Sequence, residues 1–157
     1  MSQTLTIRQA TSGDAEQMHK LHTSSVKALC KDHYSPEQIV GWLQNRTPQG
    51  YLSGIERGEM FVAVAEGRIV GFGHAVPSEV VAVYVAPECT RHGVGRAILI
   101  EGITRARSGH QGAIRLEATL NAQEFYKKAG FVEVEAKTVR RNDVLLPVIV
   151  MELRGEI

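Results

Sequence analysis

The alternation of hydrophobic and polar residues along the chain predicts seven β-strands. Residues 5–8 alternate as a half-buried strand does, and longer apolar runs recur in the middle and at the end of the chain. Glu66-Gly67-Arg68 separates two of these runs and has the composition of a hairpin turn. The predicted strands are residues 5–8, 60–65, 69–76, 80–85, 114–118, 131–139 and 144–153.

Start and stop signals predict helices between these strands. Thr11 or Ser12 caps the first helix. Ser35 begins the second, with Pro36 at its first position and Gln38 completing a capping box. Further helices are predicted at residues 93–107 and 121–129, and a short helical turn at residues 51–57. This order of elements predicts an α/β fold in which a mixed sheet carries helices on both faces.

Composition and charge narrow the class of protein. The 157 residues are 43% hydrophobic and 22% charged, so we expect residues 1–157 to form a single domain with one core. A net charge of +1 gives no reason to expect nucleic acid, and no apolar run approaches the length of a membrane span. Cys30 and Cys89 lack metal-ligand spacing, so we expect no metal site and the reduced thiols of a cytoplasmic protein.

A glycine-bearing turn between the strand at 80–85 and the following helix predicts an anion site. Gly93 and Gly95 allow a ligand to approach the backbone, and the free N–H groups of a helix start favour phosphate. Three side chains give the turn a basic character: Arg91, His92 and Arg96. The pattern therefore predicts a bound pyrophosphate.

Three phosphate-binding designs compete for this turn. A Walker loop needs lysine and then serine or threonine after its last glycine, whereas this chain has Arg96 and Ala97. The dinucleotide fingerprint fits both glycines but meets the bulky Ile98 at its third small position. Glu117, roughly 20 residues further on, is suited to binding a ribose, so a nicotinamide-dinucleotide protein stays an alternative.

The third design is found in a known family. The chain resembles the coenzyme A-binding core of the GCN5-related N-acetyltransferases (the GNAT family) in three segments: residues 83–88, Gly93-Val94-Gly95, and Asn121 to Phe131 with its Phe-Tyr and Gly-Phe pairs. The resemblance covers residues 60–153. It implies a mostly antiparallel, twisted sheet of about seven strands with about four helices on its two faces. It also implies an N-acetyltransferase that uses acetyl-CoA as co-substrate.

The resemblance further implies which residues bind acetyl-CoA. Thr90 stands where the family usually has glutamine or arginine, so it can cap the following helix but cannot extend a long arm over the pyrophosphate. Asn121 is expected to bond the cofactor, and it also suits a helix cap formed together with Glu124. The expected cofactor-binding residues are Val83, Tyr84, Val85, Thr90, Arg91, His92, Gly93, Val94, Gly95, Arg96 and Asn121.

Acetyl transfer needs a base for the amine, a donor for the carbonyl oxygen and an acid for the departing thiolate. The resemblance assigns the acid to Tyr126, whose alternative role is that of a core aromatic. A backbone N–H of residues 83–85, exposed by a bulge, would bind the oxyanion. Glu79 matches the strand glutamate that serves as base in histone-type members. His74 and a water relay are alternative bases, and a solvated Glu79 without a role fits the sequence equally well.

The acceptor is predicted only as a class, a small-molecule or peptide amine. Its pocket would come from the first helices and the last hairpin, with His33, Tyr34, Trp42 and Tyr51 as candidates, whereas His19 and His22 are expected at the surface or in packing.

Direct attack of the amine on the thioester is expected, because no Cys or Ser has a supporting His. A non-catalytic acyl-CoA sensor is the alternative function. Homodimers are common in the family, and the last two strands are the candidate interface.

Overall fold

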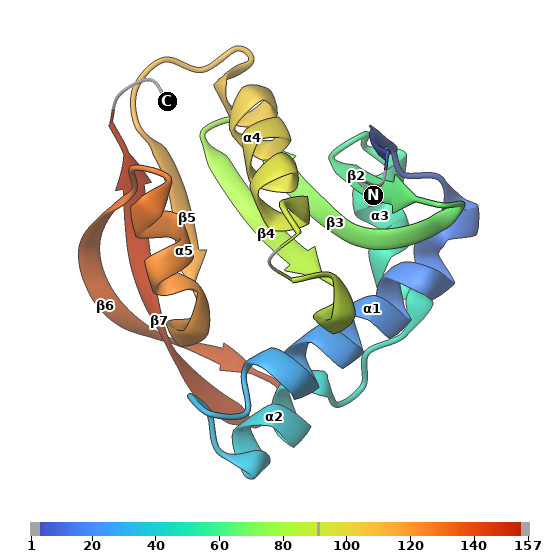
Figure 1. The fold of residues 1–157 in the computed structure, drawn as a ribbon. Helices are drawn as coiled ribbons and strands as arrows, with labels where there is room; N and C mark the ends of the chain where they lie inside the picture. Colours follow the sequence, from blue (N-terminus) through green and yellow to red (C-terminus); the bar gives the residue numbers. More distant parts are fainter. Residues whose placement is uncertain (1–3, 91, 155–157) are drawn as a thin grey trace.

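The centre of the computed structural model, which describes residues 4–90 and 92–154, is a seven-stranded sheet in the order β1-β2-β3-β4-β5-β7-β6 (Figure 1). All neighbouring strands are antiparallel except β4 and β5. The strands are β1 (Leu5–Gln9), β2 (Met60–Ala65), β3 (Arg68–Val76), β4 (Glu79–Val85), β5 (Ile114–Ala118), β6 (Val132–Arg141) and β7 (Val144–Leu153). The predicted mixed, mostly antiparallel sheet is confirmed.

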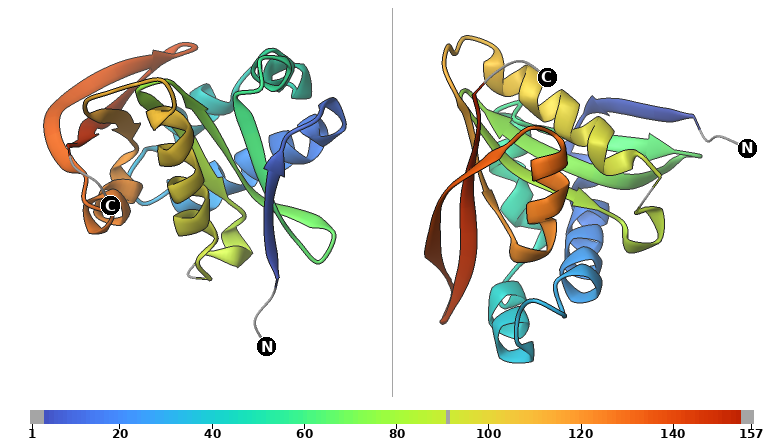
Figure 2. Two further views of the ribbon diagram at one scale, coloured as in Figure 1. Left: turned by 90° about the horizontal axis from the view of Figure 1, so that it is seen from above. Right: turned by 60° about the vertical axis from the view of Figure 1, so that its left-hand side comes forward.

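Helices cover both faces of this sheet, with α4 and α5 on one face and α1, α2 and α3 on the other (Figure 2). Within the described residues the helices are α1 (Ala15–Leu29), α2 (Pro36–Leu43), α3 (Leu52–Glu56), α4 (Val94–Arg107) and α5 (Gln123–Lys128). The fifth helix, beyond the four expected, is α3, which forms where the sequence predicted a short helical turn.

Capping residues fix the helix ends on the α1–α2 side. The Ser35 hydroxyl accepts a hydrogen bond from the Gln38 N–H, and the Gln38 side chain accepts one from the Ser35 N–H, so the predicted capping box is confirmed. Before α1, Asp14 accepts a hydrogen bond from the Thr11 N–H and pairs with Arg8 at 2.8 Å. These contacts fix where α1 and α2 begin.

Glycines of β3 bring α4 close to the sheet. A Cβ at Gly71 would lie 2.5 Å from Ile98 of α4, and one at Gly73 would lie 2.4 Å from Phe61. The dinucleotide fingerprint places its small residue on the helix, at the position that Ile98 occupies here. In this protein the strand supplies the small residues and the helix supplies the large one, so Ile98 is fully buried.

Candidate active site

The site begins where β4 and β5 separate. These parallel strands pair only at Glu79 and Arg115, and they diverge beyond that point (Figure 1). On its other side β4 pairs with β3, but Ala75 opposes Val80 and His74 opposes Ala82. Val81 is therefore an extra residue, a β-bulge of the kind that the family resemblance implies. The separation leaves main-chain groups of β4 facing open space instead of a neighbouring strand.

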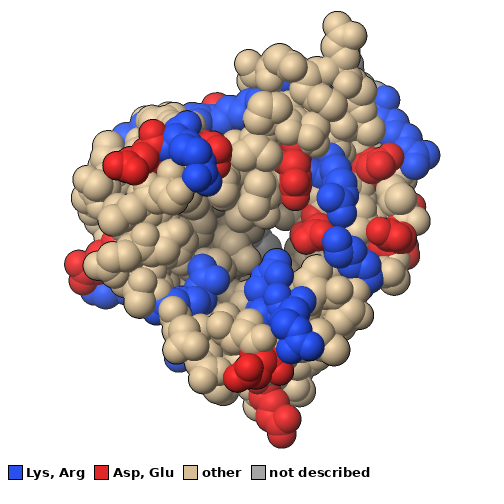
Figure 3. Space-filling view, turned by 180° about the vertical axis from the view of Figure 1, so that it is seen from behind, with Lys and Arg blue, Asp and Glu red and all other residues tan. Residues whose placement is uncertain are grey.

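A cleft of about 550 Å³ fills this space. Seen from the back, it forms a hollow in the middle of the molecule, with Lys and Arg side chains at its lower edge (Figure 3). The end of α1, strand β4, the start of α4 and the segment from β5 to α5 all contribute. The lining residues are Ser25, Leu29, Cys30, His33, Val80, Val81, Ala82, Val83, Tyr84, Val85, Thr90, Gly93, Gly95, Arg96, Glu117, Thr119, Asn121, Ala122, Phe125 and Tyr126.

The structure brings most of the expected cofactor-binding residues to this cleft. Of that set, Val83, Tyr84, Val85, Thr90, Gly93, Gly95, Arg96 and Asn121 line it. Val94 instead packs in the core beside Ile98, because its side chain points from the first turn of α4 into the sheet. His92 is exposed and does not line the cleft. Arg91 lies outside the described residues.

The turn before α4 has the geometry that an anion needs. Gly93 is the N-cap, with φ +81°, a left-handed conformation that glycine adopts without strain, and a Cβ there would meet no atom within 4 Å. The first N–H groups of α4 follow it, so the helix start opens on the cleft. Thr90 does not cap α4 as expected. Its hydroxyl donates to the Pro87 carbonyl oxygen at 3.1 Å and so closes the short 3₁₀ turn before it.

Tyr126 is both a core aromatic and a residue of the cleft. It packs edge-to-face against Phe125 and Phe131, with ring centroids 5.1 and 5.9 Å away. Burial, and to a lesser degree the neighbouring Tyr84, raise the pKa of Tyr126. The phenol therefore keeps its proton, which is the state that a proton donor requires. The two roles considered from the sequence are compatible.

Glu79 and His74, the two residues that the sequence suggested as bases, do not line the cleft. Glu79 begins β4, on the near side of the bulge, where β4 and β5 are still paired. The His74 imidazole binds Glu59, with 2.9 Å between Nε2 and Oε1. Two other proton-accepting groups do line it: Glu117, whose Oε2 lies 2.7 Å from Lys137 Nζ, and His33.

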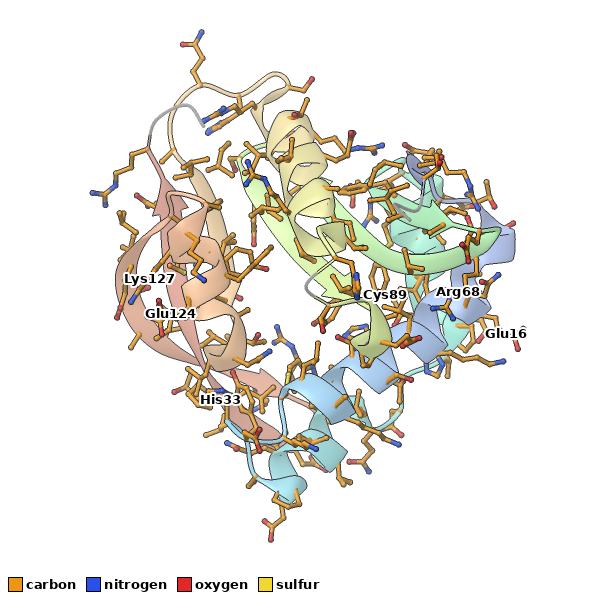
Figure 4. The ribbon with its side chains drawn as sticks, in the orientation of Figure 1. Glu16, His33, Arg68, Cys89, Glu124 and Lys127 are labelled. Carbon is orange, nitrogen blue, oxygen red and sulfur yellow. The ribbon has the colours of Figure 1, made fainter. Side chains whose placement is uncertain are left out.

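The strand alternation of β5 explains why Glu117 reaches the cleft. Ile114, Leu116 and Ala118 are buried under α4 and α5, so Glu117 between them points to the opposite face. Its place in the sequence suggested only a ribose ligand. His33 is exposed and follows the end of α1, below α5 (Figure 4). Its backbone N–H donates to the Cys30 carbonyl oxygen at 3.0 Å, and no described residue forms a hydrogen bond or ion pair with its imidazole.

Asn121 lies in the cleft but caps no helix. α5 begins at Gln123 after Ala122, and no side chain caps it. The Asn121 Oδ1 accepts a hydrogen bond from the Cys30 thiol at 3.3 Å. Burial raises the pKa of Cys30 to about 11, so the thiol stays protonated and holds the amide in place. The other cysteine, Cys89, is a free thiol outside the cleft.

Of the four residues expected around the acceptor, only His33 lines the cleft. Tyr34 is buried, and its hydroxyl donates to the Pro147 carbonyl at 2.7 Å and accepts from the Leu120 N–H at 3.1 Å. Trp42 packs on Tyr34 in the core. Tyr51 is buried too, and it joins a polar cluster that the sequence did not reveal.

That cluster lies directly behind Tyr84. His22 is buried against it, with ring centroids 3.9 Å apart, and its Nδ1 lies 2.8 Å from the Tyr51 hydroxyl. Arg46 donates from Nη2 to the same hydroxyl at 2.8 Å and to His22 Nδ1. His22 is thus a packing residue, one of the two roles expected for it, although its contacts are polar.

No described helix is long and apolar enough to cross a membrane. No three His, Cys, Asp or Glu side chains in the described part of the chain are grouped so that they could hold a metal ion.

Comparison with known proteins identifies the class. The model of the acetyltransferase (GNAT) domain matches residues 30–153, and the chain belongs to this family. It is 27% identical over 133 residues, 85% of each chain, to the uncharacterized N-acetyltransferase YafP of Escherichia coli. The protein is accordingly an acetyltransferase, and acetyl-CoA is its co-substrate.

Solved structures show the same fold. A GCN5-related N-acetyltransferase from Rhodopseudomonas palustris superposes with a TM-score of 0.90 at 24% identity, covering 99% of this chain and 98% of that one. The PaiA N-acetyltransferase of Thermoplasma acidophilum, solved with coenzyme A, gives 0.76 at 22% identity, with 97% and 99% covered. The predicted fold class and family are confirmed.

Proposed function

We propose that this enzyme transfers the acetyl group of acetyl-CoA directly to the primary amine of a small molecule or peptide. One observation supports this most strongly: the diverging edge of β4, the turn at Gly93 and the hydroxyl-bearing Tyr126 border a single cleft. A diphosphate at the start of α4 would direct the pantetheine arm along β4 toward the bulge at Val81. The residues present therefore suit acetyl-CoA.

The proposed reaction is one displacement at the thioester carbonyl. The amine nitrogen bonds to the carbonyl carbon, the carbonyl oxygen gains charge, and the carbon–sulfur bond breaks as the tetrahedral intermediate collapses. A β4 amide between Val83 and Val85 stabilises the oxyanion. Tyr126 gives its proton to the thiolate of coenzyme A. The amine loses one proton, so the products are an amide and a free thiol.

The proton leaving the amine needs an acceptor at the cleft. His33 and Glu117 line it and are proposed for this role beside Glu79, the residue matched from the sequence. Imidazole is the side chain best suited to proton exchange near neutral pH, which favours His33. Glu117 already forms an ion pair with Lys137. Replacing each with glutamine and recording pH–rate profiles separates them, because only loss of the acceptor alters the acidic limb, along which the base loses its own proton.

Thiol release tests the proposal as a whole. Purified protein is incubated with acetyl-CoA and a panel of amines while free thiol is measured. In a second experiment, its thermal unfolding is recorded with coenzyme A and with NAD. We expect amine-dependent thiol release and stabilisation by coenzyme A alone, since a ligand of the native state raises its stability. Stabilisation by coenzyme A without thiol release for any amine would identify a sensor instead, and stabilisation by NAD would revive the dinucleotide alternative.

A further inference from the structure

The cleft passes between β4 and β5 from one face of the sheet to the other. Tyr126 reaches it from α5, on the face that α4 also covers, whereas Ser25 and Leu29 reach it from α1, on the opposite face (Figure 2). The turn at Gly93, where the diphosphate is proposed to bind, lies at the start of α4. The part of the cleft against α1 is therefore the part left for the acceptor.

Ser25 presents a hydroxyl to the part of the cleft against α1. The residue lines the cleft although it is only 4% exposed, and a helix turns its side chains outward, so the side chain makes this contact. A serine or threonine inside a helix can donate to the carbonyl oxygen one turn earlier, as Thr104 does to Ile100 at 3.0 Å. Ser25 forms no such bond, and no described residue is a hydrogen-bond partner of its hydroxyl.

The Ser25 hydroxyl is open to the cleft rather than enclosed by protein. In the described part of the chain, the fully enclosed side-chain N and O atoms without a partner are His22 Nε2 and Arg46 Nε, so Ser25 Oγ is not one of them. A largely buried hydroxyl that no protein group pairs lowers stability, because it gives up most of its contact with water. A ligand that forms a hydrogen bond with Ser25 would offset this cost.

Tyr84 supplies a second hydroxyl-bearing side chain near Ser25. His22 is one helical turn before Ser25 on α1, and its ring centroid lies 3.9 Å from that of Tyr84. Residues three apart on a helix are neighbours on one face, so Ser25 and Tyr84 lie close together in the wall of the cleft. No described residue forms a hydrogen bond with the Tyr84 hydroxyl. Burial raises the pKa of Tyr84, so its phenol is uncharged.

This part of the cleft offers hydrogen bonds but no permanent positive charge. Arg96 is the one lysine or arginine among the described lining residues, and it belongs to the first turn of α4. Glu117, the lining carboxylate, is already paired with Lys137. An anionic group of the acceptor would therefore find no permanent counter-ion beside Ser25, whereas a neutral hydroxyl or carboxamide would find hydrogen-bond partners.

We infer that Ser25 and Tyr84 bind a neutral hydrogen-bonding group of the acceptor, a hydroxyl or a carboxamide carried near the amine that is acetylated. This inference rests on the proposed acetyl transfer. It favours amino alcohols and amino amides, a class that includes peptide N-termini, over simple alkylamines and over amino acids with a free carboxylate. Ser25 and Tyr84 are then specificity-determining residues, because an acceptor without such a group leaves their hydroxyls unpaired.

Matched acceptors test this inference. Propylamine has a methyl group where ethanolamine has its hydroxyl, and isobutylamine has an isopropyl group where glycinamide has its carboxamide. We expect kcat/KM, expressed per free amine, to be about 5- to 100-fold higher for the polar member of at least one pair, the range for a buried hydroxyl left unpaired. The responding pair distinguishes a hydroxyl from a carboxamide. Ratios near or below one in both pairs, or a higher value for glycine than for glycinamide, overturn the inference, while thiol release with any amine leaves the proposed function intact.

Variants locate the effect. In Ser25→Ala and Tyr84→Phe the ratio within a pair should fall several-fold, chiefly through KM of the polar acceptor. Ser24→Ala is the matched control and should keep the parent ratio, because Ser24 is the preceding residue of the same helix and is exposed to solvent. The ratio is taken within one variant, so partial unfolding cancels, and the basicity of each amine cancels between variants. Unchanged ratios in both Ser25→Ala and Tyr84→Phe contradict the site.

Stability measurements distinguish a binding role of Ser25 from a structural one. Ser25→Ala should unfold at the parent temperature or above it, because alanine favours the helix and the hydroxyl has no protein partner to lose. A clear loss of stability that Ser24→Ala does not share would reveal such a partner and overturn the inference.

A binding measurement makes the inference independent of turnover. If no amine releases thiol, the proposed function fails. The site is then judged by thermal unfolding with ethanolamine and glycinamide against propylamine and isobutylamine. Stabilisation by a polar member that Ser25→Ala abolishes supports the site. Equal behaviour of all four amines overturns it.

Discussion

Two neighbouring regions, the cleft and the polar cluster behind Tyr84, are built by different means. The part of the cleft proposed for acetyl-CoA, its cofactor half, uses main-chain groups: the freed edge of β4, the turn at Gly93 and the start of α4. The polar cluster uses side chains from separate segments, and Arg46, His22 and Tyr51 meet there across 5 to 29 residues of sequence.

This difference has a physical cause. A diphosphate and a pantetheine arm are the same in every acetyl-CoA, so strand and helix geometry, which depends little on side-chain identity, is sufficient to bind them. Acceptors differ in charge and shape, and only side chains can distinguish them. We therefore expect the proposed cofactor half to respond to backbone changes, and regions built from side chains to respond to the loss of single polar groups. The predictions below test that division, beginning with the largest effect.

Tyr126→Phe should have the largest effect, because it removes the proposed proton donor. We expect kcat to fall by about 100-fold or more, the usual contribution of general acid catalysis, while coenzyme A affinity stays nearly unchanged. Steady-state kinetics and calorimetry with coenzyme A measure the two quantities. A kcat within a few-fold of the parent would remove Tyr126 from the mechanism and leave it a core aromatic.

Gly93→Val tests the backbone character of the cofactor half. The φ of +81° disfavours a β-branched residue, and the new side chain would enter the ligand space, so coenzyme A affinity should fall by about 10- to 100-fold. Gly67→Val is a matched control, because Gly67 has φ +77° and open surroundings but lies in the β2–β3 turn. It should lower stability and leave affinity unchanged. Equal affinity losses in both variants would indicate general unfolding instead.

Most of the residues that the sequence proposed for the cofactor do lie around one cleft, because the signals that selected them are local. Gly93, Gly95, Phe125 and Tyr126 lie at family spacings, and those spacings survive folding because each falls within one strand–turn–helix unit. The bulge at Val81 could be expected only from the resemblance, since a uniformly apolar strand gives no sign of an extra residue. Counting residues along the strand selected Glu79, but the bulge and the divergence begin just after it.

The polar cluster behind Tyr84 could not be predicted from the sequence because its contacts are non-local. Arg46 has no distinctive sequence neighbours, and its contacts form only when α1 and the turn at Tyr51 are packed together. Asn121 is a case in which a local signal was overridden. Its sequence position suited a helix cap, but its side-chain oxygen accepts a hydrogen bond from the Cys30 thiol instead. Periodicity did contain one usable signal, because Glu117 alternates with buried Leu116 and Ala118 and so had to face away from α4 and α5, where it lines the cleft.

Tyr34→Phe tests whether a hydroxyl outside the cleft matters only for stability. Its loss leaves the Leu120 N–H and the Pro147 carbonyl without this partner, which should lower the free energy of unfolding by about 1–2 kcal/mol. Because the hydroxyl does not line the cleft, kcat should change little, in contrast to Tyr126→Phe. Chemical denaturation and steady-state rates give both values. A large fall in kcat at unchanged stability would place Tyr34 in the acceptor site after all.

The smallest effect should be a pH dependence of stability arising from His22. Its pKa is lowered in the folded protein, so between the folded value and about 6.5 the unfolded chain binds more protons. Stability should therefore be unaffected by this group above pH 6.5 and should fall as the pH decreases below it, by at most about 1.4 kcal/mol per pH unit for one proton. Asp14 and Glu59, whose pKa values are also lowered, act only at lower pH. Denaturation at pH 7.5 and 5.0 should show a smaller difference in His22→Asn than in the parent. Equal differences would mean that His22 is charged in the fold, and the cluster with Arg46 would then need an anion from within the protein.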